Sequence, residues 1–415
     1  MDARSGRLAA IVFAVAVVTN FGYLAWQRHD LTADDSPTYV APAKQLADGH
    51  GFRNAYGLPE TRRTPLYPLL LAPFVNLPHG LLWAAAAQHL VNAALAVGVF
   101  WLALIAFGDA AAAMIAALLF SIDLASLHHA NQILTETAFT AAMFAAAALL
   151  LRRRYAAAAL VAGGAVLIRP IGLYLFVPMA LFATLDAERR RAVAALSVIV
   201  AFAVVPFVWA LRNERIGGEL TVSTITSWSI LFDRAAAALS VANEPPCGND
   251  IQCWRLELAR RAGDPPPATY SNHINRAIDR FHPARWRAIA RRELLAHPLA
   301  YAKIHAVGIG RMLLGGGAQI VYDRLHVPLG AARAAVAIYN GAFALLAAIG
   351  AAVAWRTNRR AALVLLIFVV YALATTSVAE SSARFRVPVM PMLAVFAGLG
   401  AHAVAGRSGR ASAAA

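Results

Sequence analysis

Charged side chains are scarce in this chain of 415 residues, in which they make up only 14%. Soluble globular domains carry about a quarter, so the sequence argues against an ordinary water-soluble protein. Hydrophobic residues make up 60%, and apolar runs that approach the roughly 20 residues needed to cross a bilayer recur along the chain. Backbone groups inside a bilayer must bond within their own segment, so these runs are expected to be helices.

Acidic residues are also few, 22 against 37 lysines and arginines, which gives a net charge of +15. Such an excess can indicate nucleic-acid binding. Here the arginines fall in short hydrophilic gaps between apolar runs, the positive-inside pattern that orients membrane proteins. Nucleic acid is therefore not an expected partner, and these gaps are expected to face the cytoplasm. The arginines concerned are Arg4, Arg7, Arg152–Arg154, Arg189–Arg191, Arg356, Arg359, Arg360, Arg407 and Arg410.

Cysteine is nearly absent: only Cys247 and Cys253 occur. Two cysteines are too few for a cysteine metal site. They form a disulfide if their loop is periplasmic, and free thiols are the equal alternative. Residues 1–26 begin with basic residues and continue through an apolar run with no small-residue cleavage site, which predicts an uncleaved first helix.

The apolar runs predict an all-α polytopic membrane protein of about ten transmembrane helices, with juxtamembrane helices on the outer surface. The expected spans are 8–26, 82–107, 110–127, 133–151, 155–168, 171–185, 192–211, 331–354, 361–379 and 387–405.

Two hydrophilic regions, 27–64 and about 212–296, are too long for tight connections, and alternation from an inside amino terminus places both outside. Segment 297–318 is ambiguous. If it crossed the membrane, the arginines after residue 355 would lie outside, so we expect it, like 65–77, to be a surface helix. The chain then divides into three parts: a catalytic transmembrane module, 1–211, with first outer loop 27–64; an outer loop with surface helices, 212–330; and carboxyl-terminal spans, 331–415.

The first outer loop holds the most informative polar residues. Asp34 and Asp35 follow the first span, and Arg63 precedes the return of the chain into lipid. A carboxylate and an arginine at a membrane surface suit a reaction on an anionic lipid, because the acid can accept a proton and the cation can steady a phosphate. The simpler alternative is that one aspartate caps the following helix.

Three motifs in this loop resemble the first outer loop of GT-C glycosyltransferases: D-x-x-x-Y from Asp35 to Tyr39, A-x-x-L-x-x-G-x-G-F, and R-x-P-x-Y-P through Arg63 and Tyr67. The branch resembled includes protein O-mannosyltransferases, the lipid A aminoarabinose transferase and the Rhizobium lipopolysaccharide galacturonosyltransferases. The resemblance implies inverting transfer of a sugar from a polyprenyl-phosphate donor, with Asp35 as general base. Ser36 stands where many members have glutamate, so the second acid is missing or displaced to Asp34.

Later landmarks follow in the same order. The resemblance carries over Glu136 in LTETAF, which would orient the acceptor or the sugar, and it matches VVPFVWALRN, which contains Arg212, to the family's exit into the large outer loop. The simpler alternative for Glu136 is an acid at a helix start, favoured by the helix dipole. For the arginines it is side chains that reach the membrane interface from helix ends. Four outer arginines favour a donor-phosphate site instead: Arg63, Arg169, Arg384 and Arg386. Glu380 and Arg384 are expected at the outer face together.

Tyr39, Tyr67, His128 and His129 are expected to line the same site. The two adjacent histidines could hold a divalent metal with a carboxylate, but neighbouring side chains diverge, so no metal or other cofactor is expected. We therefore predict a glycosyltransferase of the bacterial inner membrane whose active site faces the periplasm, with a glycolipid, glycan or protein as acceptor. The rival functions are a transporter or flippase of lipid-linked sugars and a non-catalytic envelope protein.

Overall fold

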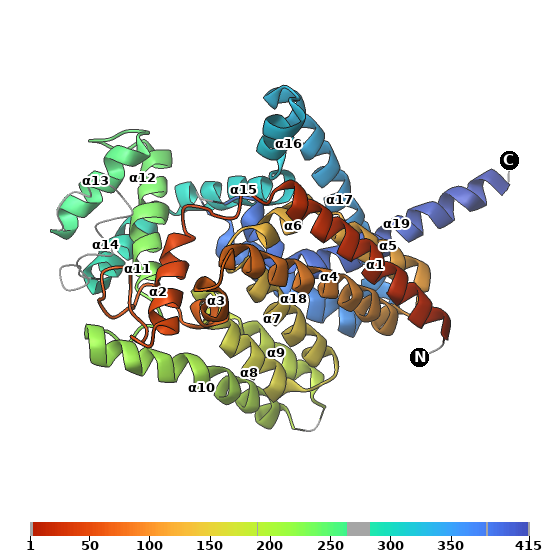
Figure 1. The fold of residues 1–415 in the computed structure, drawn as a ribbon, viewed down its shortest axis with the longest axis horizontal. Helices are drawn as coiled ribbons and strands as arrows, with labels where there is room; N and C mark the ends of the chain where they lie inside the picture. The colour runs from red at the N-terminus through yellow and green to blue at the C-terminus, as the bar shows by residue number, and fades with distance from the viewer. Residues whose placement is uncertain (1–2, 189, 264–282, 379–380, 414–415) are drawn as a thin grey trace.

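The computed structural model describes residues 3–188, 190–263, 283–378 and 381–413. These residues fold almost entirely into helices, and within them β-pairing is limited to one bridge between Arg53 and Pro59. The expected all-α class is therefore confirmed (Figure 1). Arg189 and Glu380 lie outside the described residues.

Six helices in the described part of the chain are long and apolar enough to cross a membrane, and a bent pair would make a seventh. Predicted spans 133–151, 155–168 and 171–185 correspond to shorter apolar helices, so the multi-pass character is confirmed but the number ten is not. The six are α1 (Ala3–Trp26), α4 (Gly80–Phe107), α10 (Arg191–Gly217), α17 (Leu329–Thr357), α18 (Arg359–Thr376) and the segment Ala383–Gly406, most of which is α19 (Met390–Ala413). The shorter ones are α7 (Glu136–Leu151), α8 (Tyr155–Val166) and α9 (Phe176–Asp186), the last preceded by a 3-10 turn, Pro170–Tyr174.

The predicted span 110–127 is two helices, α5 (Ala110–Ser121) and α6 (Leu124–Asn131), which meet at an angle of 47°. The break occurs at Asp123, whose carboxylate accepts a hydrogen bond from the Ser126 amide and caps α6. An acid that caps a new helix cannot also continue the old one, which explains the bend.

Glycines bring the last helix very close to its neighbours. A methyl group added at Gly350 of α17 would lie 1.7 Å from the Phe396 carbonyl oxygen, and one at Gly400 would lie 2.0 Å from the Leu346 oxygen. Such backbone-to-backbone contact is the way small residues join membrane helices. It fixes α19, and with it the 3-10 turns, Ala383–Phe385 and Val387–Val389, that precede this helix.

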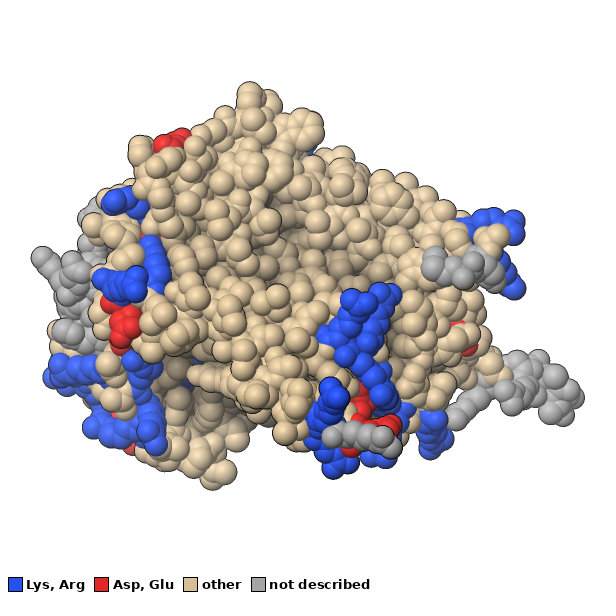
Figure 2. Space-filling view, turned by 90° about the horizontal axis from the view of Figure 1, so that it is seen from below, with Lys and Arg blue, Asp and Glu red and all other residues tan. Residues whose placement is uncertain are grey.

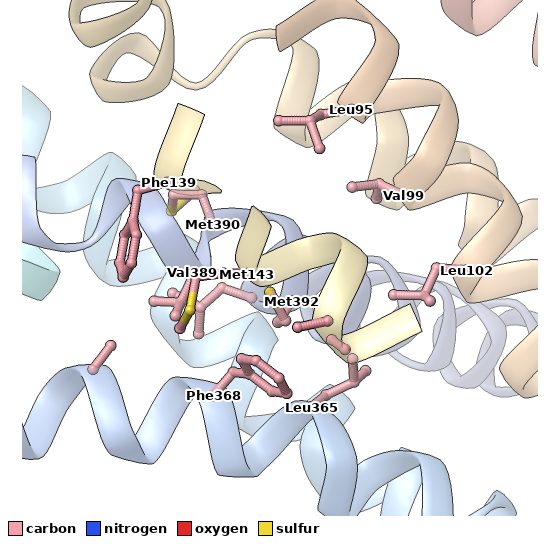
Figure 3. Packing of buried hydrophobic residues seen from close by; sticks show 14 of the residues in the cluster. Leu95, Val99, Leu102, Phe139, Met143, Leu365, Phe368, Val389, Met390 and Met392 are labelled. Atoms are coloured by element: carbon pink, nitrogen blue, oxygen red, sulfur yellow. The ribbon is translucent and has the colours of Figure 1, made fainter. Parts of the chain in front are cut away.

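Buried apolar side chains join α7, α18 and the start of the last helix (Figure 3). Phe139 and Met143 come from α7, Phe368 from α18, and Val389 and Met390 from the start of the last helix. Glu136 begins α7, and Arg384 lies in the 3-10 turn Ala383–Phe385 just before these last-helix residues. The packing therefore fixes the segments that carry these two side chains.

The segment expected as an outer hydrophilic loop, about 212–296, folds into short helices with a core of their own, shown in green at one side of Figure 1. Trp228, Phe232, Trp254 and Trp286 pack together there, and a disulfide joins Cys247 to Cys253, which decides between the two alternatives for these cysteines. The helices are α11 (Ile225–Trp228), a π-helical turn (Ser229–Ala235), α12 (Ala236–Ala242), α13 (Ile251–Ala262) and α14 (Pro283–Ala296), followed by α15 (Pro298–Leu314) and α16 (Ala318–Leu325).

Charged residues are unevenly distributed on the surface. Figure 2 shows lysines and arginines gathered in separate groups, with a wide surface free of charge between them. An uncharged band of this kind is what the hydrocarbon core of a bilayer requires, because charged groups exposed to it are costly. The surface therefore agrees with a multi-pass membrane protein.

Candidate functional site

Asp35 lies between two arginines that come from distant parts of the chain. Its Oδ1 accepts a hydrogen bond from Nη2 of Arg63 at 2.5 Å, and its Oδ2 accepts one from Nη1 of Arg384 at 2.9 Å. Burial raises the pKa of Asp35, but the charges of Arg63 and Arg384 outweigh this and hold the pKa well below its usual range. The side chain is still 34% exposed. Asp35 is therefore an ionised carboxylate that a substrate can reach.

Glu136, the first residue of α7, is fully buried. Its Oε1 accepts from Nη1 of Arg169 at 2.5 Å and from Nε of Arg384. Among the described residues no donor reaches its Oε2, which is also buried. A buried carboxylate oxygen without a donor is costly, so Oε2 is an unused hydrogen-bond acceptor beside Arg169 and Arg384.

Arg384 joins the two acids because its guanidinium contacts both Asp35 and Glu136. The cluster thus contains three arginines, Arg63, Arg169 and Arg384, and two carboxylates. With all five groups ionised its net charge is 3 − 2, or +1. Such a cluster can bind an anion next to a carboxylate. We call these five residues the acid–arginine cluster.

Arg63 is held in place by α2 (Pro37–Ala47). Its Nε donates to the Thr38 hydroxyl and its Nη1 to the Tyr39 hydroxyl, both at 2.9 Å, and its guanidinium lies 4.5 Å from the centre of the Tyr39 ring. Tyr39 meets Tyr67 of α3 (Leu66–Val75) edge to face at 5.3 Å. Both tyrosines that the sequence placed at the site therefore pack beside the cluster.

Gln88 on α4 binds the backbone just before Glu136. Its amide group donates to the carbonyl oxygens of Ala130 and Gln132 at 3.0 and 2.8 Å and accepts from the Tyr67 hydroxyl at 2.8 Å. It thus fixes the turn that leads into Glu136. Sequence reasoning missed Gln88; the signal was a polar side chain within an apolar span, where such groups are costly unless they bond within the protein.

Glu60 is a second residue next to the cluster that the sequence did not indicate. Its Oε1 accepts from the backbone amides of Arg62 and Arg63 at 2.6 and 3.0 Å, and its side chain is buried. Burial raises the pKa of Glu60, and hydrogen bonds from those two amides oppose the rise. Its place three residues before Arg63, where an acid can cap the following turn, is the signal.

Two predicted site residues lie apart from the acid–arginine cluster. Asp34 is exposed, and among the described residues no side-chain hydrogen bond or ion pair holds it. Arg386 is buried and donates to the carbonyl oxygens of Met312 and Leu313, to Asn340, and to Asp123 at 3.5 Å. Its contacts join the last helix to α15, α6 and α17, and none is to the cluster.

The two histidines lie on α6. Nδ1 of His128 is 3.2 Å from the Tyr23 hydroxyl, whereas His129 is near enough to Glu136 for an electrostatic interaction. Nδ1 of His129 is buried and has no hydrogen-bond partner in the described part of the chain. Residues 3–188, 190–263, 283–378 and 381–413 contain no group of three or more histidine, cysteine or acidic side chains placed to hold a metal ion.

No protein-family model matches this sequence, and no curated protein matches it. The fold does have known counterparts. The oligosaccharyltransferase of Archaeoglobus fulgidus, solved in its apo form, aligns with a TM-score of 0.54 at 14% identity over 97% of this chain and 51% of its own. This chain thus spans about half the length of that enzyme. The likeness shows that this chain shares the fold of that enzyme, which agrees with the GT-C fold expected from the sequence motifs.

A second solved structure is ArnT from Cupriavidus metallidurans bound to undecaprenyl phosphate. The alignment covers 94% of this chain and 77% of that protein at 14% identity, with a TM-score of 0.41. That score is too low for a residue-level comparison.

Proposed function

We propose that this protein is an inverting glycosyltransferase that moves a sugar from a polyprenyl-phosphate donor to a hydroxyl group of an acceptor. The observation that carries the proposal is the position of Asp35, an accessible carboxylate within a cluster of net charge +1. An ionised acid beside a phosphate site is the arrangement that glycosyl transfer from a phosphate carrier requires.

In the proposed reaction the acceptor oxygen attacks the anomeric carbon from the side opposite the phosphate. The carbon–oxygen bond to the phosphate breaks, its electron pair stays on the departing polyprenyl phosphate, and the acceptor proton passes to Asp35. Arg63, Arg169 and Arg384 stabilise the charge that develops on the phosphate. A phosphodiester with one negative charge would neutralise the cluster, which favours a monophosphate-linked donor.

Donor binding would also strengthen the base. Arg63 and Arg384 together keep Asp35 ionised, so a phosphate that draws either guanidinium away raises the proton affinity of this carboxylate. Glu136 would use its free Oε2 to orient a hydroxyl of the sugar or acceptor. Tyr39, Tyr67 and His129 would line the same space, with His128 at its edge.

The proposed location is the bacterial inner membrane, with the cluster facing the periplasm. Two observations support it: arginine-rich gaps at the other helix ends favour the cytoplasm, and the disulfide between Cys247 and Cys253 fits an oxidising compartment. The division into 1–211, 212–330 and 331–415 remains part of this proposal, as does the acceptor class, a glycolipid such as lipopolysaccharide, a glycan or a protein.

The second candidate is a transporter or flippase of lipid-linked sugars, which the break between α5 and α6 favours, because broken helices are common in transporters.

An assay in detergent solution distinguishes the two functions, because a flippase then has no bilayer across which to move its lipid-linked substrate. Purified protein would be incubated with labelled polyprenyl-phosphate sugars and delipidated envelope extract. Transfer of label that disappears in Asp35→Asn supports the enzyme; an active Asp35→Asn variant or no transfer by the wild type would count against it. Mass spectrometry of envelope glycolipids from a deletion strain would then identify the acceptor.

A further inference from the structure

Arg212, at the outer end of α10, binds the first outer loop rather than lipid. Its Nη1 donates to the carbonyl oxygen of Glu60 at 2.5 Å and its Nη2 to that of Phe52 at 3.4 Å. The guanidinium also lies 4.7 Å from the Trp209 ring centre and 5.6 Å from that of Phe52. A planar cation that donates to two carbonyls and lies against two aromatic rings is held in a fixed orientation.

The segment that follows α10 binds the same loop a few residues later. The hydroxyl of Ser223 donates to the Arg62 carbonyl oxygen at 2.5 Å, and the Thr224 amide donates to that of Thr61 at 3.1 Å. Asn213 shapes this segment by donating to the carbonyls of Thr221 and Val222. Backbone oxygens of residues 60, 61 and 62 are thus all bound by α10 or the segment after it.

Within the loop, Glu60 turns these contacts into a fixed position for Arg63. Its carboxylate caps the amides of Arg62 and Arg63, while its own carbonyl accepts from Arg212. Arg63, at the end of this turn, belongs to the acid–arginine cluster and contacts Asp35. A continuous set of hydrogen bonds therefore runs from α10 through Glu60 to Arg63.

We propose that Arg212 and Glu60 are positioning residues that hold the 60–63 turn so that Arg63 meets both Asp35 and the donor phosphate. This inference rests on the proposed transferase function. Neither side chain bonds to a charged group of the acid–arginine cluster: Glu60 binds the backbone amides of Arg62 and Arg63, and Arg212 binds the Glu60 carbonyl. Their effect on the reaction is through geometry, for which a displacement of about 1 Å can cost on the order of 100-fold in rate.

Arg215 provides a matched control, since it is an exposed arginine on the last turn of the same helix. Hydrogen exchange and turnover would be measured on the full-length purified protein for Arg212→Ala, Arg212→Lys and Arg215→Ala. Arg212→Ala should speed amide exchange in residues 52–63 and lower kcat by about 10- to 100-fold. Lysine should restore part of the loss, because it keeps the charge but not the planar fork. Arg215→Ala should match the wild type in both measurements.

Glu60 offers a second pair of variants if Arg212→Ala fails to fold. Glu60→Gln keeps an oxygen that can accept from both amides, so its kcat should stay within a few-fold of the wild-type value. Glu60→Ala loses this oxygen, and its kcat should be at least about tenfold lower than that of Glu60→Gln. Faster exchange in 52–63 with unchanged turnover would overturn the positioning role, and so would unchanged exchange in Arg212→Ala. A wild-type protein without transferase activity would instead refute the proposed function, while the exchange data would still show whether Arg212 holds the loop.

Discussion

Arg384 donates a hydrogen bond to Asp35 at 2.9 Å although 349 residues separate them in the sequence. The same guanidinium contacts Glu136, so one side chain connects an acid of the 27–64 segment to the acid that begins α7. Any chemistry at Asp35 therefore depends on the position of the last helix as well as on the first loop.

Asp35→Asn should reduce turnover by about 10²- to 10⁴-fold, the effect typical of losing a general base. Membrane expression should stay near normal, since this partly exposed carboxylate adds little to helix packing. Asp34→Asn is the control: Asp34 is exposed and outside the cluster, so its loss should be mild. Both would be assayed with the same donor. If only Asp34→Asn is inactive, the base has been assigned one residue too late; if both are active, the acid–base mechanism is wrong.

Arg384→Ala should weaken use of the donor, because Asp35 and Glu136 would each keep a single arginine partner. We expect a raised KM for the polyprenyl-phosphate donor together with a lower kcat. Lysine should rescue only in part, since an ammonium group cannot contact both acids in the planar geometry of guanidinium. Full activity of Arg384→Ala over a donor titration would contradict a role in phosphate binding.

Arg386→Ala should act on stability instead. It leaves the buried Asp123 without its arginine and removes the donors to Asn340 and to two carbonyls of α15. Loss of one partner from a buried ion pair costs about 3–5 kcal/mol. Thermal unfolding in detergent should show a clearly lower midpoint, with donor KM close to wild type at low temperature. A raised KM with an unchanged midpoint would return Arg386 to the phosphate site.

The stabilising effect of Asp35 should depend on pH. Its folded-state pKa is lowered by Arg63 and Arg384, whereas the unfolded-state value is about 3.9. A lowered acid pKa means that ionisation stabilises the fold above about pH 4, and that this contribution is lost as pH falls toward the folded-state pKa. The difference in melting temperature between wild type and Asp35→Asn should therefore shrink between pH 6 and pH 3. A difference that is constant with pH would mean that the ion pairs add no stability.

Topology provides a test that is independent of activity. Reporter fusions after Arg154 and Arg360 should give a cytoplasmic signal, and fusions near Gly51 and Gly263 a periplasmic one. A periplasmic signal at Arg360 would mean that α15 crosses the membrane.

The sequence predicted the helical membrane fold because long apolar runs leave few alternatives, and motif order placed Asp35, Arg63, Glu136, Arg169 and Arg384 on one side. It could not separate Arg384 from Arg386. Arg384 lies in the 3-10 turn Ala383–Phe385, and Arg386 connects that turn to the next one, Val387–Val389. The first arginine contacts the cluster and the second contacts Asp123.

Two other features depend on tertiary contacts that a linear pattern does not contain. The outer segment reads as hydrophilic because only one face of each short helix is buried, yet Trp228, Trp254 and Trp286 build a core there. The count of spans was similarly uncertain, because helices of 11 to 16 residues such as α7, α8 and α9 are apolar but short.

The order of synthesis gives the position of Arg384 a further consequence. Asp35, Arg63, Glu136 and Arg169 leave the ribosome long before it, so in the growing chain Glu136 has Arg169 as its only arginine partner in the cluster until the last helix follows. Because glycines bring that helix directly against the backbone of α17, the cluster is completed only after α19 has packed. A chain in which α19 is not yet in place would therefore lack the third cation, so the proposed donor would meet a complete site only on molecules that have already packed this helix.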